Sequence, residues 1–437
     1  MSIPFALDTV LAVGVDPHRE SLDVIAIHFP EEIVLDETFD NTRVGHRALW
    51  SKARALAAEQ GLSLIFGLED GSNYGYALGR YLVNQGICVK EVNPRMTSRQ
   101  RDFYGEDKTN RLDALATAAI LLRAYDRLPD VAVVQEATEA TQELSRYREQ
   151  LVKEQTANLN RLHRHLANQY PTYKTFFSQL NGVTALHFWA TYPTPAHLRA
   201  TTPQELAHFL HEKSKHCLGA ESARQKARQI FKALDDAPWS EPGLLAKAQG
   251  TLIRDLAQRL LQLKRSIQGI EAKLEETVPA TGQQLETFQG IGTVSAAVLI
   301  GETRDTARFN HDKDRFAKYN GSAPVTKGTG KHARQVENHW CNRRLKSILG
   351  QVALAARHNE PLSAEYYQAC LDRGLDPGEA HKRLMRRLSD IIFAMMRDKT
   401  PYDPEIHRRK QQRHKRKGKS AAPAVTGGLS LALFPPR

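Results

Sequence analysis

Short runs of apolar residues alternate with longer amphipathic stretches over the first part of the chain. The short runs predict strands and the amphipathic stretches predict helices, with Gly61, Gly86 and Asn93-Pro94 separating them. Strands are expected near 10–16, 22–29, 32–38, 62–69 and 87–92, and helices near 43–60, 74–85 and 110–124. Consecutive strands followed by strand–helix alternation predict a mixed sheet with helices packed on it.

This order of elements fits a ribonuclease-H-like fold, which gathers carboxylates at the ends of its first and fourth strands and on a late helix. A nucleotide-binding fold has a comparable order, but no glycine-rich phosphate loop follows the first strand here. We therefore expect residues 1–130 to form an α/β domain of the ribonuclease-H-like (RuvC-like) type that binds metal.

The periodicity becomes helical from residue 131 onward. One long helix is expected near 135–170 and a second near 244–277, with a small helical insertion between them. Pairing within one chain would give an antiparallel stalk and pairing between chains a dimer, and periodicity alone does not separate the two. Residues 131–280 are thus predicted to be a helical coiled-coil connector. The second helix repeats apolar residues at alternating spacings of four and three: Leu256, Leu260, Leu263, Ile267, Ile270 and Leu274.

A compact all-α domain is expected at 281–405, followed by a basic disordered tail at 406–437. The domain opens with a Gly-x-Gly segment that resembles a helix-hairpin-helix turn. Gly290 and Gly292 would let the backbone approach a phosphate, and the following helix would supply amide donors. A plain connection between helices is the alternative.

Charge is concentrated in the C-terminal third. The whole chain has a net charge of +12, and residues 282–437 hold 28 Lys and Arg against 15 Asp and Glu, which is the entire excess. This distribution favours a polyanionic partner, most commonly nucleic acid, over a solvated basic face. Arg408–Lys419 carries eight basic residues and no acid, so it should contact phosphates without reading sequence.

Other classes of protein fit the chain poorly. No basic-then-apolar leader or run of about 18 apolar residues is present. We therefore expect a soluble cytoplasmic protein with no membrane partner. The four cysteines are far apart and match neither zinc-ligand spacing nor a disulfide framework.

Acidic side chains stand at the ends of two predicted buried strands and on one helix. Asp16 and Glu69 end apolar runs, while Asn110 and Asp113 share one face at the start of the helix near 110–124. Three or four such groups on separate elements can hold two Mg²⁺ ions for phosphodiester cleavage. Asn110 brings an oxygen without charge, and Asp107, one turn earlier, is an alternative ligand.

These contexts resemble the RuvC-like DEDD insertion-sequence transposases, a group that includes bridge-RNA-guided recombinases. The resemblance rests on motifs at both ends of the chain. They are Gly14-Val-Asp16, Glu69-Asp-Gly-Ser-Asn-Tyr74-Gly, Val92-Asn-Pro94, Lys108-Thr-Asn110-Arg-Leu-Asp113-Ala, Gly290-Ile-Gly-Thr-Val-Ser-Ala-Ala, Arg308-Phe, Tyr319-Asn-Gly-Ser-Ala-Pro324, Asn342-Arg-Arg-Leu and Pro401-Tyr-Asp-Pro404.

The resemblance implies a C-terminal transposase domain whose nucleophilic serine follows a Gly-x-x-Pro turn by five residues. Thr329 occupies that place here and keeps a hydroxyl able to attack phosphorus, with Ser322 as the second candidate. Five basic residues are candidates for holding nucleic-acid phosphates: Lys327, Lys331, Arg334, Arg343 and Arg344.

The sequence therefore predicts a DNA transposase or recombinase that cleaves and rejoins strands with Mg²⁺. Strand exchange needs two DNA ends held together, so a homo-oligomer, either a dimer or a tetramer, is expected. A structured guide RNA is implied by the resemblance alone. Asn110 and Thr329 keep two alternatives open, a catalytically degenerate copy that binds nucleic acid and a metal nuclease of the Holliday-junction type.

Overall fold

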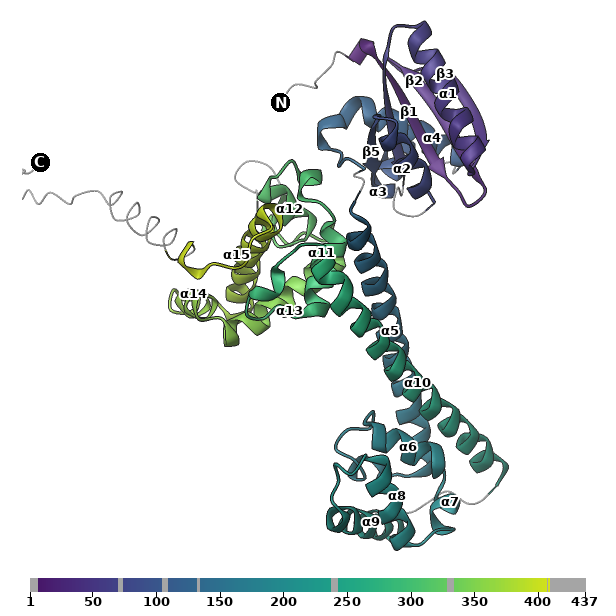
Figure 1. Cartoon of the computed structure of the whole chain (residues 1–437), viewed down its shortest axis with the longest axis vertical. Coiled ribbons are helices and arrows are strands. Elements are labelled where there is room, and N and C mark those ends of the chain that lie inside the picture. The colour runs from purple at the N-terminus through teal and green to yellow at the C-terminus, as the bar shows by residue number, and fades with distance from the viewer. Residues whose placement is uncertain are drawn as a thin grey trace, which may run out of the picture.

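The computed structural model describes residues 7–69, 74–103, 109–131, 134–236, 243–327, 334–406 and 408. A mixed sheet with its helices and a bundle of C-terminal helices lie near one end of a long helical pair, and a smaller helical unit lies at the other end (Figure 1). We call these the sheet domain (7–131), the stalk (α5 and α10), the tip (170–243) and the C-terminal domain (281–406). No helix in the described ranges is long and apolar enough to cross a membrane.

Five strands form the sheet in the order β3-β2-β1-β4-β5. The central strand β1 runs antiparallel to β2 and parallel to β4, and β4 runs parallel to β5. This arrangement is the mixed, ribonuclease-H-like sheet that the alternation predicts. Its elements are η1 (Leu7–Thr9), β1 (Val10–Pro17), β2 (Ser21–His28), β3 (Glu32–Asp40), α1 (Arg43–Glu59), β4 (Ser63–Glu69), α2 (Tyr76–Asn84), β5 (Cys88–Val92), α3 (Pro94–Arg101), α4 (Asn110–Ala124) and η2 (Tyr125–Arg127).

The two faces of the sheet are covered by different helices. Alternate residues of a strand point to opposite faces, so Leu11 and Val13 pack with Leu49 of α1 while Val10 and Ala12 pack with α4. The even-numbered face of β1, which carries Asp16, therefore lies under α4.

The stalk is an antiparallel pair made within one chain. α5 (Glu136–Gln169) leaves the sheet domain and α10 (Leu244–Ala280) returns from the tip. Gln135 Nε2 donates to the Ala280 carbonyl at 3.3 Å, and Gln169 Nε2 donates to Gln249 Oε1 at 2.5 Å, so opposite ends of the helices meet. In this chain, the apolar seam of α10 is buried against its own α5.

The tip closes around aromatic side chains. Trp189 is fully buried, stacks on Phe176 with centroids 5.7 Å apart, and meets the ring of Tyr170. Its elements are η3 (Tyr173–Thr175), α6 (Val183–Thr191), α7 (Pro195–Arg199), α8 (Pro203–Lys213) and α9 (Ala220–Asp235).

The C-terminal domain is helical except for a two-stranded antiparallel sheet that the sequence pattern did not predict. Its strands, β6 (Val325–Lys327) and β7 (Arg334–Val336), are three residues long, too short for alternation to reveal. The other elements are η4 (Leu285–Thr287), α11 (Thr293–Thr303), η5 (Thr306–Phe309), α12 (Lys313–Tyr319), α13 (Arg343–Asn359), α14 (Pro361–Leu371) and α15 (Pro377–Asp398).

Buried ion pairs attach the C-terminal domain to its neighbours. Glu302 of α11, 4% exposed, accepts from Arg146 of α5 and from Arg344 of α13 at 2.9 and 2.6 Å. Arg308, with a side chain 7% exposed, pairs with Glu91 of β5 at 3.2 Å. The sheet domain is thus linked to the C-terminal domain directly as well as through the stalk.

Candidate active site

Asp16 and Glu69 stand at the same edge of the sheet. β1 and β4 are parallel neighbours in the register Gly14↔Gly67, and each carboxylate follows its glycine by two residues. Residues two apart on a strand share a face, so both carboxylates lie on the face that α4 covers. The sequence contexts had predicted strand-terminal carboxylates, and the register places them on adjacent strand ends.

α4 approaches this face where the two glycines lie. A Cβ on Gly14 would stand 2.1 Å from the Ala114 carbonyl oxygen and 2.4 Å from the Ala118 nitrogen, both backbone atoms. A Cβ on Gly67 would meet Leu121 at 2.9 Å. The absence of both side chains lets the helix lie directly on the strands, which brings Asp113 in its first turn, 8% exposed, toward the strand ends.

The three carboxylates lie within electrostatic range of one another. Burial raises the pKa of Glu69 to about 7; the Thr97 hydrogen bond and Arg101 oppose this shift, and the charges of Asp113 and Asp16 add to it. Burial also raises the pKa of Asp16, where His18 opposes the shift and Asp113 adds to it. The site therefore concentrates negative charge that a cation would relieve.

Two basic side chains already approach these carboxylates. Arg101, the last residue of α3, forms an ion pair with Asp113, and both side chains are largely buried. His18 Nε2 lies 3.2 Å from Asp16 Oδ2. Glu69 Oε2 is buried and has no hydrogen-bond partner among the described residues.

The donor set suits a hard divalent cation, because all of its candidate ligands are oxygen atoms and one is buried without a partner. Across the described part of the chain, no group of three His, Cys, Asp or Glu side chains is arranged to hold a metal as it stands. Metal binding would require Asp113 to exchange its Arg101 partner for the ion.

Asn110 is the first residue of α4 and lies one turn before Asp113. It is exposed, while Asp113 is buried, and Thr109 caps the helix by accepting from the Leu112 amide at 3.3 Å. Asp107, the alternative ligand, falls outside the described residues.

Sequence reasoning missed α3, which supplies Thr97 and Arg101. Its sequence, Pro-Arg-Met-Thr-Ser-Arg-Gln-Arg, has no apolar period, so a search for amphipathic helices passes over it. A capping signal was present, because Asn93 accepts from the Arg95 amide at 2.9 Å and Pro94 occupies the first helical position.

The hydroxyl candidates of the C-terminal domain are only partly described. Thr329 and Lys331 lie outside the described residues. Lys327 and Arg334 pair in backbone register at the end of β6 and β7. The Ser322 hydroxyl is buried without a hydrogen-bond partner in the described ranges.

The remaining candidates for nucleic-acid contact differ in their surroundings. Gly290 has φ +116°, and a Cβ there would stand 3.1 Å from the Ala356 nitrogen, so this glycine packs against α13. Gly292, before α11, has open space around it. Arg344 is engaged with Glu302 and Glu149, whereas Arg343 is exposed.

Comparison with known proteins identifies the family. Residues 13–171 match the DEDD_Tnp_IS110 family model, described as "Transposase", and residues 282–368 match a model described as "Transposase IS116/IS110/IS902 family". Together the two matches cover more than half of the chain. The protein belongs to the IS110 family of transposases. Transposases of this family act on DNA, which they cleave and rejoin.

Relatives in the IS110 family match along most of their length. The "Insertion element IS110 uncharacterized 43.6 kDa protein" of Streptomyces coelicolor is 28% identical over 383 residues, 85% of this chain and 90% of that protein. The "Insertion element IS116 uncharacterized 44.8 kDa protein" of Streptomyces clavuligerus is 27% identical, over 74% of this chain and 80% of its own. A Thermus thermophilus RuvC structure, titled as a complex with Holliday junction substrate, matches 28% of this chain and 99% of its own, with 12% identity and a TM-score of 0.22.

The close contact at Gly14 makes a prediction for this transposase. Gly14→Ala should lower the free energy of unfolding by about 1–3 kcal/mol, because the added methyl group forces α4 away from β1. Chemical denaturation measures the loss. Gly269→Ala in α10 is the matched control, since a Cβ there meets no atom within 4 Å, and it should not destabilise the protein. Equal effects of both substitutions would contradict the packing account.

The raised pKa of Glu69 predicts a pH dependence of stability without divalent ions. Folding raises this pKa from the usual 4.5 to about 7, so the folded state holds the proton more tightly. The associated stability is present below pH 4.5 and is lost as the pH rises through 7, by about 2–3 kcal/mol. Denaturation curves across this window, in a chelator, measure it. Glu69→Gln should remove most of the slope, and an unchanged slope would contradict the assignment.

Proposed function

We propose that this IS110-family protein is a DNA recombinase of an insertion sequence, in which the carboxylates of the sheet domain and a hydroxyl of the C-terminal domain act on the same strand. The observation that supports it most is the grouping of Asp16, Glu69 and Asp113, each on a different element and each within electrostatic range of the others. A fold gains no stability from such a cluster without cations, so its chemistry is the better reason for it.

In this proposal the three carboxylates hold Mg²⁺, with Asn110 or Asp107 as a further oxygen ligand. The ions would supply activation of the attacking oxygen and stabilisation of the leaving oxygen at phosphorus. Arg101 then releases Asp113, while Thr97 keeps its hydrogen bond to Glu69 and fixes the orientation of that carboxylate. His18 lies within reach of Asp16 and can orient it.

The hydroxyl of Thr329 is the proposed nucleophile. Its oxygen attacks the scissile phosphorus and loses its proton, one P–O bond of the DNA breaks, and the departing strand end takes up a proton. Rejoining reverses these steps with the hydroxyl of another strand end. Support comes from the Gly-x-x-Pro spacing of the family and from the positive charge of the surrounding third of the chain.

The oligomeric state follows from the same chemistry, whereas a guide RNA rests on the family resemblance. Two DNA ends must be held together for exchange, so we propose a homodimer or a tetramer. A guide RNA is proposed on the family resemblance, and the basic C-terminal third, including Arg408–Lys419, would contact phosphates of either nucleic acid.

The test is whether Thr329 forms a covalent bond to DNA. Wild-type protein, duplex DNA carrying the element ends and Mg²⁺, with the element's flanking noncoding transcript added in parallel, should give an adduct on denaturing gels. Thr329→Ala should abolish it, because the attacking oxygen is gone, and Thr329→Ser should keep it.

Control variants separate the alternatives. Thr326→Ala removes a neighbouring exposed hydroxyl of β6 and should leave the adduct intact. An adduct that survives in Thr329→Ala but is lost in Ser322→Ala would move the nucleophile to Ser322. Cutting without any adduct would indicate a simple metal nuclease, and binding without cutting a degenerate copy.

A further inference from the structure

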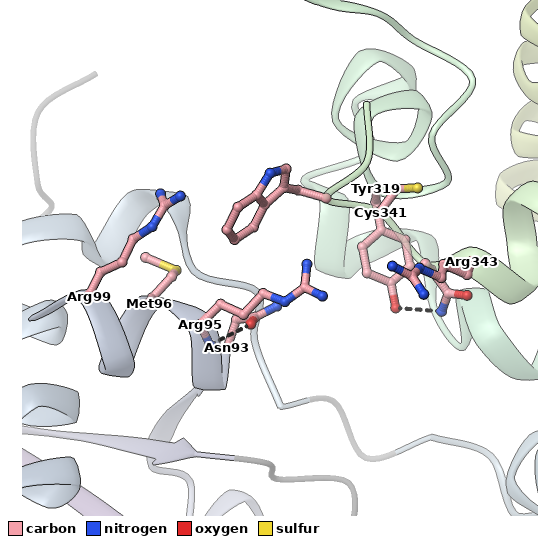
Figure 2. A pocket seen from close by; sticks show the side chains of 9 residues that line it. Asn93, Arg95, Met96, Arg99, Tyr319, Cys341 and Arg343 are labelled. Carbon is pink, nitrogen blue, oxygen red and sulfur yellow. Dashed lines mark hydrogen bonds between the residues drawn. The ribbon is translucent and has the colours of Figure 1, made fainter. Parts of the chain in front are cut away.

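A cavity of about 510 Å³ lies between the sheet domain and the C-terminal domain. Arg95 and Arg99 approach it from α3, and Tyr319 and Arg343 approach it from the other side (Figure 2). Its volume falls in the range of small-molecule sites, about 300–1,000 Å³. A single nucleotide is small enough to enter such a space.

Trp340 provides an aromatic surface in this cavity. It precedes α13 and is 55% exposed, so part of its ring can be reached from solvent. The Arg99 and Arg95 guanidinium carbons lie 4.4 and 4.8 Å from the ring centroid. Aromatic side chains are the common surface on which unpaired bases stack, and arginine adds cation–π contacts at such sites.

The three arginines of the cavity have no carboxylate partner among the described residues. Elsewhere at the domain contacts, arginines are compensated: Arg308 pairs with Glu91 of the sheet domain, and Arg146 of the stalk pairs with Glu302. If the arginines of the cavity served only to hold the two domains together, we would expect each of them to pair with a carboxylate in the same way. Three unpaired guanidinium groups around one cavity instead fit an anionic ligand.

The cavity adjoins the carboxylates through one short helix. α3 contributes Arg95 and Arg99 to the cavity, and it contributes Thr97 and Arg101 to the carboxylate site. Residues two apart on a helix point to nearly opposite sides, so α3 separates the cavity from the carboxylates by a helix width of about 10 Å. A DNA strand whose scissile phosphate meets Asp16 and Glu69 would therefore reach the cavity with a nucleotide a few positions away.

We propose that this cavity binds an unpaired nucleotide of the DNA strand, a few positions from the scissile phosphate. The base stacks on Trp340, and the arginines contact its phosphates. The amides at the cavity are already engaged: Asn93 Oδ1 accepts from the Arg95 amide at 2.9 Å, and Asn342 Nδ2 donates to the Tyr319 hydroxyl at 3.2 Å. Stacking on an aromatic ring is available to every base, so we expect the site to accept any of them. This inference rests on the proposed function for the identity of the strand.

Binding of labelled single strands to the full-length protein in a chelator tests the site without cleavage. The probes are oligothymidylate, a strand of equal length that lacks bases, and the oligothymidylate annealed to its complement. Trp340→Ala should weaken binding of oligothymidylate about tenfold, because base stacking is lost. It should leave binding of the abasic strand and of the duplex unchanged. Trp340→Phe should keep most of the preference for bases.

Charge is tested separately from stacking. The double substitution Arg95→Gln with Arg99→Gln should weaken binding of oligothymidylate and of the abasic strand alike, since both strands carry the same phosphates. Arg259→Gln with Arg265→Gln, two exposed arginines of α10, is the charge-matched control. Trp50→Ala removes a tryptophan under another arginine, Arg54 at 5.9 Å, far from the cavity, and should not alter the preference for bases.

Three results would overturn the inference. If Trp340→Ala weakened binding of oligothymidylate and of the abasic strand equally, Trp340 would be a contact between domains. If it changed neither, Trp340 would take no part in binding nucleic acid. Dependence on Trp340 seen with oligouridylate but not with oligothymidylate would assign the cavity to RNA. Because no cutting is involved, base-dependent binding in a protein that never forms the Thr329 adduct would leave this inference standing while the proposed function fails.

Discussion

The contact of α4 with Gly14 and Gly67 is the constraint on which the rest of the site depends. Backbone atoms of Ala114 and Ala118 occupy the space in which a side chain of β1 would stand. Because the helix lies so close, its first turn reaches the ends of two parallel strands, and Asp113 comes within electrostatic range of Asp16 and Glu69. The two glycines are adjacent in register, so a single packing surface positions three carboxylates.

Grouping these carboxylates has an electrostatic cost, and nearby arginine and histidine side chains offset part of it. Arg101 neutralises Asp113, and His18 approaches Asp16, but one oxygen of Glu69 has no partner among the described residues. Arg101 belongs to α3, whose other arginines meet Trp340 of the C-terminal domain. The same short helix, α3, therefore contacts both the carboxylates and the C-terminal domain.

Much of this arrangement could be predicted from the sequence. Alternating apolar runs located the five strands, and the apolar-run-then-acid contexts located Asp16 and Glu69, because both signals are local. The spacing of apolar residues along α10 did not identify the helix that packs against it, because α5 of the same chain and a helix of a second chain would fit the same seam. In the structure, α10 pairs with α5 of its own chain. α3 was missed because Met96 is its one large apolar residue, so it shows no apolar period, and its helix is defined by a cap and by tertiary packing. The ion pair of Arg101 with Asp113 depends on that helix and was equally hidden.

The site residues that the family resemblance implies have different structural support at the two ends of the chain. At the sheet domain, residue contexts, strand register and electrostatics agree on one site. At the C-terminal domain, the assignment of Thr329 rests on spacing and on family likeness, and of Lys327 and Arg334 only the backbone pairing is described. The proposed metal site is consequently the part of the account that physical measurement can address most directly. Titration of the protein with Mn²⁺, followed by electron paramagnetic resonance, measures how much of the ion is bound. The wild type should bind Mn²⁺, and a folded Asp113→Asn variant should lose that binding. Binding of Mn²⁺ by Asp113→Asn as tightly as by the wild type would contradict the claim that α4 completes the site.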